Sequence, residues 1–116
     1  TMSRMRTKQA LKALSALAQE SRLAVFKLLV RHGKEGLSAG DISQKLDIPA
    51  PTLSFHLSHL SNAELVTSRK DGRVVIYSPH FDCMKNLLEY LLERCSEESM
   101  IPLGEDEKGA AEGNVA

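Results

Sequence analysis

A short break in the middle of the chain, Asp47-Ile48-Pro49, separates two segments whose apolar residues recur at helical spacing. The segment before the break opens with Ser38-Ala39-Gly40-Asp41, a capping-box pattern, and places Ile42 and Leu46 on one side of a short helix. The segment after the break, residues 51–63, begins with a proline that suits a first helical turn and carries one narrow stripe of leucines. Two helices joined by three or four residues are a candidate helix-turn-helix.

A β-hairpin is predicted directly after this motif. Two β-rich runs, residues 65–70 and 73–77, flank the dipeptide Asp71-Gly72, and Pro79 ends the second run. Asp-Gly between two such runs is a strong hairpin signal, because both central residues of the turn need a positive φ. Three basic residues crowd the predicted tip: Arg69, Lys70 and Arg73.

The segments on either side of these elements are predicted to be helical. Residues 1–31 contain two helices, of which the second closes at His32-Gly33 and has Ser21 as its cap or in its first turn. The apolar residues of the first helix are Ala10, Leu11, Leu14, Leu17 and Ala18. A further amphipathic helix covers about residues 80–96, and its apolar stripe consists of Phe81, Met84, Leu88, Leu91 and Cys95.

Helix, helix, helix-turn-helix, hairpin and helix together are the winged-helix arrangement, which is mainly α with a β-hairpin wing. A chain of 116 residues allows one such domain, which we place at residues 8–96, after an extension at 1–7 and before an acidic tail at 97–116 that is predicted to be disordered. Two cysteines and apolar stretches of only four to five residues indicate a reducing, cytoplasmic location with no membrane partner.

The charges of the chain are unevenly divided although their total is zero. Residues 1–79 carry twelve basic and six acidic side chains, whereas residues 80–116 carry three basic and nine acidic ones. This asymmetry indicates a body that faces nucleic acid and a C-terminal part with another use. The alternative interpretation is a solvated acidic tail without a specific role.

The helix at residues 51–63 has a polar side that suits the major groove. The side opposite its leucines is formed by Pro51, Thr52, Phe55, Ser58, His59 and Asn62, flanked by Ser54 and by His56, which lies nearer the core. Hydroxyls can hydrogen-bond to base edges and an apolar ring can contact a thymine methyl, while the basic wing neutralises phosphates. The alternatives are a polar side that contacts nothing and a winged helix that binds protein.

Catalysis is not expected from these residues. The serine–histidine neighbours Ser54/His56 and Ser58/His59 lack an Asp placed to orient either imidazole. A glycine elbow and an oxyanion loop are also absent from the sequence pattern. We therefore predict a binding protein and not an enzyme.

Three stretches resemble the ArsR/SmtB family of bacterial arsenic- and metal-responsive repressors. They are Leu14-Ser15-Ala16-Leu17-Ala18 followed by Ser21-Arg22-Leu23, then Thr52-Leu53-Ser54-Phe55-His56-Leu57-Ser58-His59-Leu60, and Gly72-Arg73-Val74-Val75-Ile76-Tyr77. The resemblance implies a homodimer, built from the first and last helices, that binds a palindromic operator in double-stranded DNA and leaves it when an inducer binds. It also carries a DNA-facing role over to Ser54 and Phe55.

The sensor sites of that family are not matched here. Ser38-Ala39-Gly40 stands where the family has its Cys-Val-Cys arsenic site, and both histidines of the last-helix zinc pattern are replaced, which leaves too few ligands for zinc. Cys83 and Cys95 remain, as packing residues or as a thiol site shared between two subunits. Such a site suits a trivalent arsenical with one carbon substituent, or a disulfide under oxidant. A ligand-independent regulator is the further alternative, and no cofactor is expected for folding.

Overall fold

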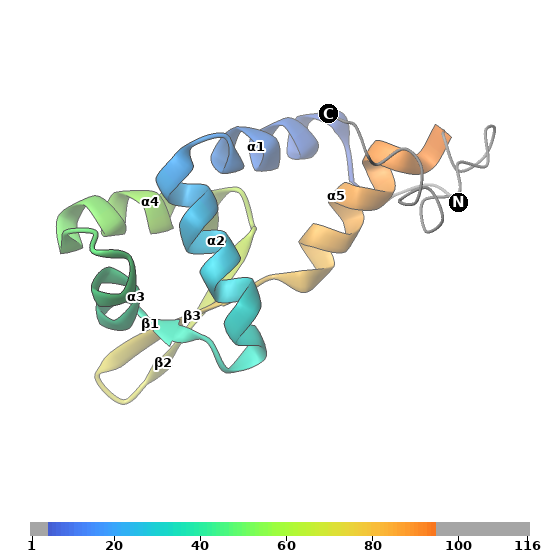
Figure 1. Ribbon diagram of the computed structural model, residues 1–116. Helices are drawn as coiled ribbons and strands as arrows, with labels where there is room; N and C mark the ends of the chain where they lie inside the picture. Colours follow the sequence, from blue (N-terminus) through green and yellow to red (C-terminus); the bar gives the residue numbers. More distant parts are fainter. Residues whose placement is uncertain (1–4, 95–116) are drawn as a thin grey trace, which may run out of the picture.

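The computed structural model of the protein describes residues 5–94. In chain order its elements are α1 (Thr7–Leu17), α2 (Glu20–His32), the single 3₁₀ turn η1 (Gly33–Glu35), β1 (Leu37–Ser38), α3 (Ala39–Leu46), α4 (Ala50–Asn62), β2 (Val66–Asp71), β3 (Val74–Pro79) and α5 (Phe81–Arg94). Figure 1 shows α4 and the tip of the β2–β3 hairpin toward one side of the molecule and α5 toward the other. The prediction of a mainly α fold with a hairpin wing is confirmed.

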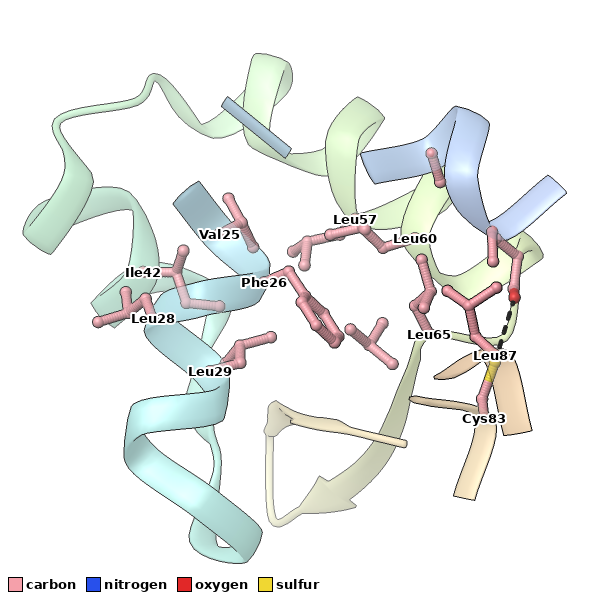
Figure 2. Packing of buried hydrophobic residues seen from close by; sticks show 14 of the residues in the cluster. Val25, Phe26, Leu28, Leu29, Ile42, Leu57, Leu60, Leu65, Cys83 and Leu87 are labelled. Atoms are coloured by element: carbon pink, nitrogen blue, oxygen red, sulfur yellow. Dashed lines mark hydrogen bonds between the residues drawn. The ribbon is translucent and has the colours of Figure 1, made fainter. Parts of the chain in front are cut away.

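The hydrophobic core is centred on α2, which packs against α1, α3, α4 and the sheet. Its residues Val25, Phe26 and Leu29 are buried in the cluster that also contains Leu57 and Leu60 of α4 (Figure 2). The core then continues through Leu65 to Leu87 on α5. A helix that is apolar on most of its circumference is expected in such a central position. Within residues 5–94 every helix is too short or too polar to span a membrane.

The buried side of α1 is formed by small residues. Its buried residues are alanines, Ala10, Ala13 and Ala16, whereas Leu11 is 61% exposed and Leu14 is also exposed. Small side chains allow α1 to lie close against α2 and α4, so the longer leucines project from its flank. The helix predicted from apolar spacing is present, and part of its predicted apolar stripe is in solvent.

The hairpin is confirmed, but its turn lies one residue later than predicted. Asp71 pairs with Val74, so the two central turn residues are Gly72 and Arg73. Only Gly72 of these two has a positive φ, 68°, which is the pattern of a turn with glycine in its first central position. Asp71 is therefore the last residue of β2, and in the turn the left-handed conformation is taken by glycine.

A short strand that was not predicted, β1, adds to the hairpin on the β3 side and gives the sheet order β1-β3-β2. Leu37 pairs with Tyr77, and Gly36 precedes the strand with a φ of 75°. A Cβ atom built on Gly36 lies 2.5 Å from the carbonyl oxygen of Tyr77. Only glycine therefore fits at this close approach of the two chain segments.

The last helix, α5, packs through one side and exposes another. Cys83 and Leu87 are buried against the body, whereas Phe81, Leu88 and Leu91 of the predicted stripe are exposed. Thr7 on α1 and Tyr90 on α5 share a hydroxyl–hydroxyl hydrogen bond that joins the two helices. The predicted end of this helix at residue 96, the tail at 97–116 and most of the extension at 1–7 lie outside the described residues.

Candidate DNA-binding surface

The turn between α3 and α4 sets the direction in which α4 leaves the core. The hydroxyl oxygen of Ser38 accepts a hydrogen bond of 3.0 Å from the backbone N–H of Asp41, as the capping pattern predicted. Asp47 ends α3 in the left-handed conformation, with φ 55° and ψ 49°. Pro49 is the N-cap of α4 and Pro51 lies in its first turn, where a missing backbone N–H leaves no hydrogen bond broken.

The two sides of α4 are cleanly separated. Leu53, Leu57 and Leu60 are buried together with His56. The side chains predicted to face DNA are all exposed: Pro51, Thr52, Ser54, Phe55, Ser58 and His59. Because α4 contains no Asp, Glu, Lys or Arg, this exposed side offers hydroxyls, rings and imidazole groups without a charge that repels phosphate.

The two largest groups of this exposed side are in contact with each other. The ring centroids of Phe55 and His59 are 4.6 Å apart, with an angle of 73° between the ring planes, which is an edge-to-face arrangement. Residues four apart are neighbours on a helix, and edge-to-face pairs are the favoured geometry of aromatic rings. The Phe55 ring is still 58% exposed, so the pair presents an ordered apolar edge to solvent.

His56 contacts Arg22 inside the domain, a pairing that the sequence pattern does not indicate. Its Nδ1 lies 3.4 Å from an Nη atom of Arg22, whose Nε donates a 2.8 Å hydrogen bond to the carbonyl oxygen of Ala16. A guanidinium only donates, so Nδ1 accepts and the ring proton is on Nε2. Burial lowers the pKa of His56, and the positive charge of Arg22 and then that of His59 lower it further.

This contact ties α4 to the junction of α1 and α2. His56 is only 7% exposed, which confirms its predicted place near the core. Arg22 belongs to the Ser21-Arg22-Leu23 motif, but the spacing of residues within one helix does not indicate a partner thirty-four residues away. Gln19 caps α2 by accepting from the backbone N–H of Arg22 at 2.9 Å, and Ser21 lies in the first turn, the second of the two positions predicted for it.

The three basic residues of the wing are exposed but have different surroundings. Arg69 donates to the carbonyl oxygen of Glu35 at 3.0 Å and to the hydroxyl of Ser78 at 3.4 Å, so it braces the hairpin against η1. Lys70 lies in the last part of β2 and Arg73 lies in the turn itself. Arg69 therefore stabilises the hairpin from within, whereas Lys70 and Arg73 lie at its tip.

The predicted thiol site is only partly described. Cys83 is buried against the body, and its sulfur lies 3.9 Å from the carbonyl oxygen of Ala63 (Figure 2). Burial raises the pKa of the Cys83 thiol, and the nearby Glu64 carboxylate raises it further. Cys95 lies outside the described residues. Residues 5–94 contain no group of three or more His, Cys, Asp or Glu side chains that could hold a metal ion.

Helix-turn-helix, wing and flanking helices define a winged helix-turn-helix domain, the class of DNA-binding domain whose second motif helix enters the major groove. A family model described as a helix-turn-helix domain matches residues 17–69. The homodimeric winged helix-turn-helix DNA-binding domain Mb0332 of Mycobacterium bovis, a possible ArsR-family regulator, superimposes with a TM-score of 0.62. That match covers 80% of this chain and 82% of the other at 23% identity, and it shows the shared fold.

Sequence relatives identify the family. The chain is 40% identical over 78 residues to the HTH-type transcriptional regulator YceK of Bacillus subtilis, which covers 67% of this chain and 77% of that protein. It is 33% identical over 78 residues to the arsenical resistance operon repressor of Staphylococcus aureus, which covers 67% and 72%. The protein belongs to the ArsR family of winged-helix transcriptional regulators.

Proposed function

We propose that the protein is a homodimeric repressor that binds a palindromic operator and leaves it when an inducer binds. The observation that carries the proposal is the charge-free, exposed side of α4 beside a basic wing. Ser54, Phe55 and Ser58 lie on that side, and we assign them to base edges in the major groove. Lys70 and Arg73 are assigned to phosphates, which fix the position of the domain on DNA.

The assignment of a homodimer is supported by a second exposed surface. Apolar residues that one fold of this size leaves uncovered lie on α1 and α5: Leu11, Leu14, Phe81, Leu88 and Leu91. Exposed leucines at such density are typical of an interface between subunits. The homodimeric state of Mb0332, a protein of the same fold, supports the same arrangement.

For the inducer we propose a soft, thiol-binding compound, specifically a trivalent arsenical that already carries one carbon substituent. The support is the presence of Cys83 and Cys95 and the relation to a repressor of an arsenical resistance operon. Because Cys83 is buried against Ala63, the inducer has to draw this residue away from the end of α4. A disulfide formed under oxidant would displace Cys83 in the same way.

The DNA part of the proposal is tested with an operator fragment selected from random sequence and a scrambled duplex of equal length. We expect Ser58→Ala to weaken operator binding by about 1–3 kcal/mol and to leave scrambled DNA nearly unaffected. Lys70→Ala and Arg73→Ala should weaken binding to both duplexes and reduce the slope of affinity against salt by about one each. Equal losses on both duplexes for Ser58→Ala would show that the base-reading side is misassigned.

The inducer part is tested separately by release of operator DNA on addition of phenylarsine oxide or hydrogen peroxide. Cys83→Ser and Cys95→Ser should each abolish release while operator affinity stays unchanged, because serine cannot bind arsenic in place of a thiolate. Full release of both single variants by both reagents would show that the two cysteines are packing residues.

A further inference from the structure

A cavity of about 310 Å³ lies between α1, the turn that joins α4 to β2, and the start of α5. Its polar lining comes from all three segments, with Lys12 from α1, Asn62 and Glu64 from the end of α4 and its turn, and His80 and Asp82 beside α5. Cavities of this size are at the lower end of those that hold small molecules. The lining includes Asn62 at the end of α4 and Cys83, which we assign to the inducer, but none of Ser54, Phe55 and Ser58, which we assign to bases.

The cavity also lies apart from the apolar surface of α1 and α5. On α5 the lining residues Asp82 and Asn86 are about 120° or more around the helix from Leu88. On α1 the lining residue Lys12 is about 100° from the exposed Leu11. A dimer built on the leucines therefore leaves a different flank of both helices for the cavity.

The lining of the cavity carries more negative than positive side chains. His80 Nδ1 is 2.9 Å from the carbonyl oxygen of Glu64, and because a carbonyl only accepts, Nδ1 carries the proton. Two carboxylates, Glu64 and Asp82, add negative charge against the single cationic side chain of the lining, Lys12.

We propose that this cavity binds a small organic cation that carries several N–H donors, such as an amine or a guanidinium compound. The carboxylates of Glu64 and Asp82 neutralise the charge of the ligand, and charge-assisted hydrogen bonds to them are the strongest contacts available in the cavity. Lys12 belongs to another element of the lining, α1, and its charge opposes that of the ligand. Although Glu64, His80 and Asp82 all line the cavity, no three or more His, Cys, Asp or Glu side chains of the described residues are grouped so that they could hold a metal ion.

The cavity lies at the C-terminal end of α4, the helix whose exposed side we assign to DNA. Asn62 is the last residue of α4, and Glu64 follows with a φ of 63°, held by its backbone N–H at 2.9 Å from the carbonyl oxygen of Ser61. The side chains assigned to bases, Ser54, Phe55 and Ser58, lie four to eight residues earlier in the same helix, a rise of about 6–12 Å. A ligand here contacts the same rigid element, and in this respect the inference deepens the proposed function.

The test is a titration of the full-length, ¹⁵N-labelled protein with agmatine, in the absence of DNA and with 1,4-butanediol as a neutral analogue. We expect agmatine to shift the amide resonances of residues 62–65 and 80–86, and the diol to leave them unchanged. Glu64→Gln and Asp82→Asn should each weaken agmatine binding at least tenfold. Glu89→Gln, which removes an exposed carboxylate of α5 outside the cavity, is the matched control and should bind as the parent does.

Lys12→Gln sharpens the test, because removal of its charge should tighten agmatine binding. Weaker binding by Lys12→Gln, equal binding by Glu64→Gln, Asp82→Asn and Glu89→Gln, or no shifts at millimolar agmatine would each overturn the proposal. The spectra of the free variants report whether each of them is folded. If only the proposal about the cavity is wrong, agmatine does not bind but the protein still prefers operator over scrambled DNA. If only the proposed function is wrong, that preference is absent while agmatine still binds.

Discussion

The exposed side of α4 and the exposed sides of α1 and α5 both leave large side chains in solvent, but their chemistry differs. On α4 one aromatic ring, Phe55, stands among hydroxyls and an imidazole, with no carboxylate or ammonium on the helix. On α1 and α5 the large exposed apolar residues are mostly leucines, with Leu11 at 61% and Leu88 at 54% exposure. A base edge requires hydrogen-bonding groups, whereas a second copy of the chain requires complementary apolar area.

The comparison teaches that exposure alone does not identify a binding surface. The composition of each exposed side indicates the kind of partner it suits, and α4 and α5 lie toward different sides of the fold (Figure 1). A substitution on one surface should therefore affect one partner directly and the other only through assembly.

The largest expected effect is on the dimer. Leu88→Glu places a charge in the centre of the apolar side of α5, and we expect it to raise the dimer dissociation constant more than a hundredfold, about 3 kcal/mol, because that charge has no buried partner. Sedimentation at micromolar concentration should then show a folded monomer. Operator affinity should fall as well, since the two half-sites are no longer bound by one particle.

Lys85→Glu is the matched control, because Lys85 is exposed on the same helix, outside the apolar stripe. It should remain a dimer. If the parent protein itself sediments as a stable monomer at micromolar concentration, α1 and α5 are not the dimer surface.

A smaller effect is expected on the other surface. Phe55→Ala should weaken operator binding by about 1–3 kcal/mol and leave the melting temperature nearly unchanged, since the ring is 58% exposed. Leu53→Ala, on the buried side of the same helix, should instead lower the free energy of unfolding by about 2–5 kcal/mol. Calorimetry of both variants measures the change in stability, and operator titration measures the change in DNA affinity. A large loss of stability in Phe55→Ala would contradict the assignment of this ring to DNA binding alone.

The smallest expected effect is at His56, whose contact with Arg22 joins α4 to the junction of α1 and α2. Its pKa in the folded protein is lowered from the ordinary 6.5, chiefly by burial and then by Arg22, so the unfolded chain binds a proton more readily. The contribution of His56 to stability is therefore complete above about pH 6.5 and is lost as the pH falls through the window below it. Thermal unfolding between pH 7.5 and 5.5 should show this slope.

His56→Gln should reduce that slope, whereas His32→Gln, which changes an exposed residue at the end of α2, should not. An unchanged slope in His56→Gln would mean that another group titrates. Because the expected change involves a single proton, it should be visible as a shift in melting temperature and not as a loss of folding.

Much of the fold followed from local patterns. The helices at residues 39–46 and 50–62 were predicted because caps, prolines and leucine spacing are local signals, and the exposed positions of Phe55 and Ser58 followed from 3.6 residues per turn. The hairpin was predicted from the turn dipeptide, but its register was not. Register depends on which residues of β2 are buried, and Val66 is the buried one.

What the sequence determined by itself was the order of the elements and the side of α4 that stays in solvent, because both depend on residues within a few positions of one another. The tertiary structure decided the rest. It buried the alanines of α1 and exposed Leu11, joined Arg22 to His56, and formed the cavity at Glu64 from three separate segments. These features depend on how closely distant segments approach, and local spacing in a sequence carries no information about that distance.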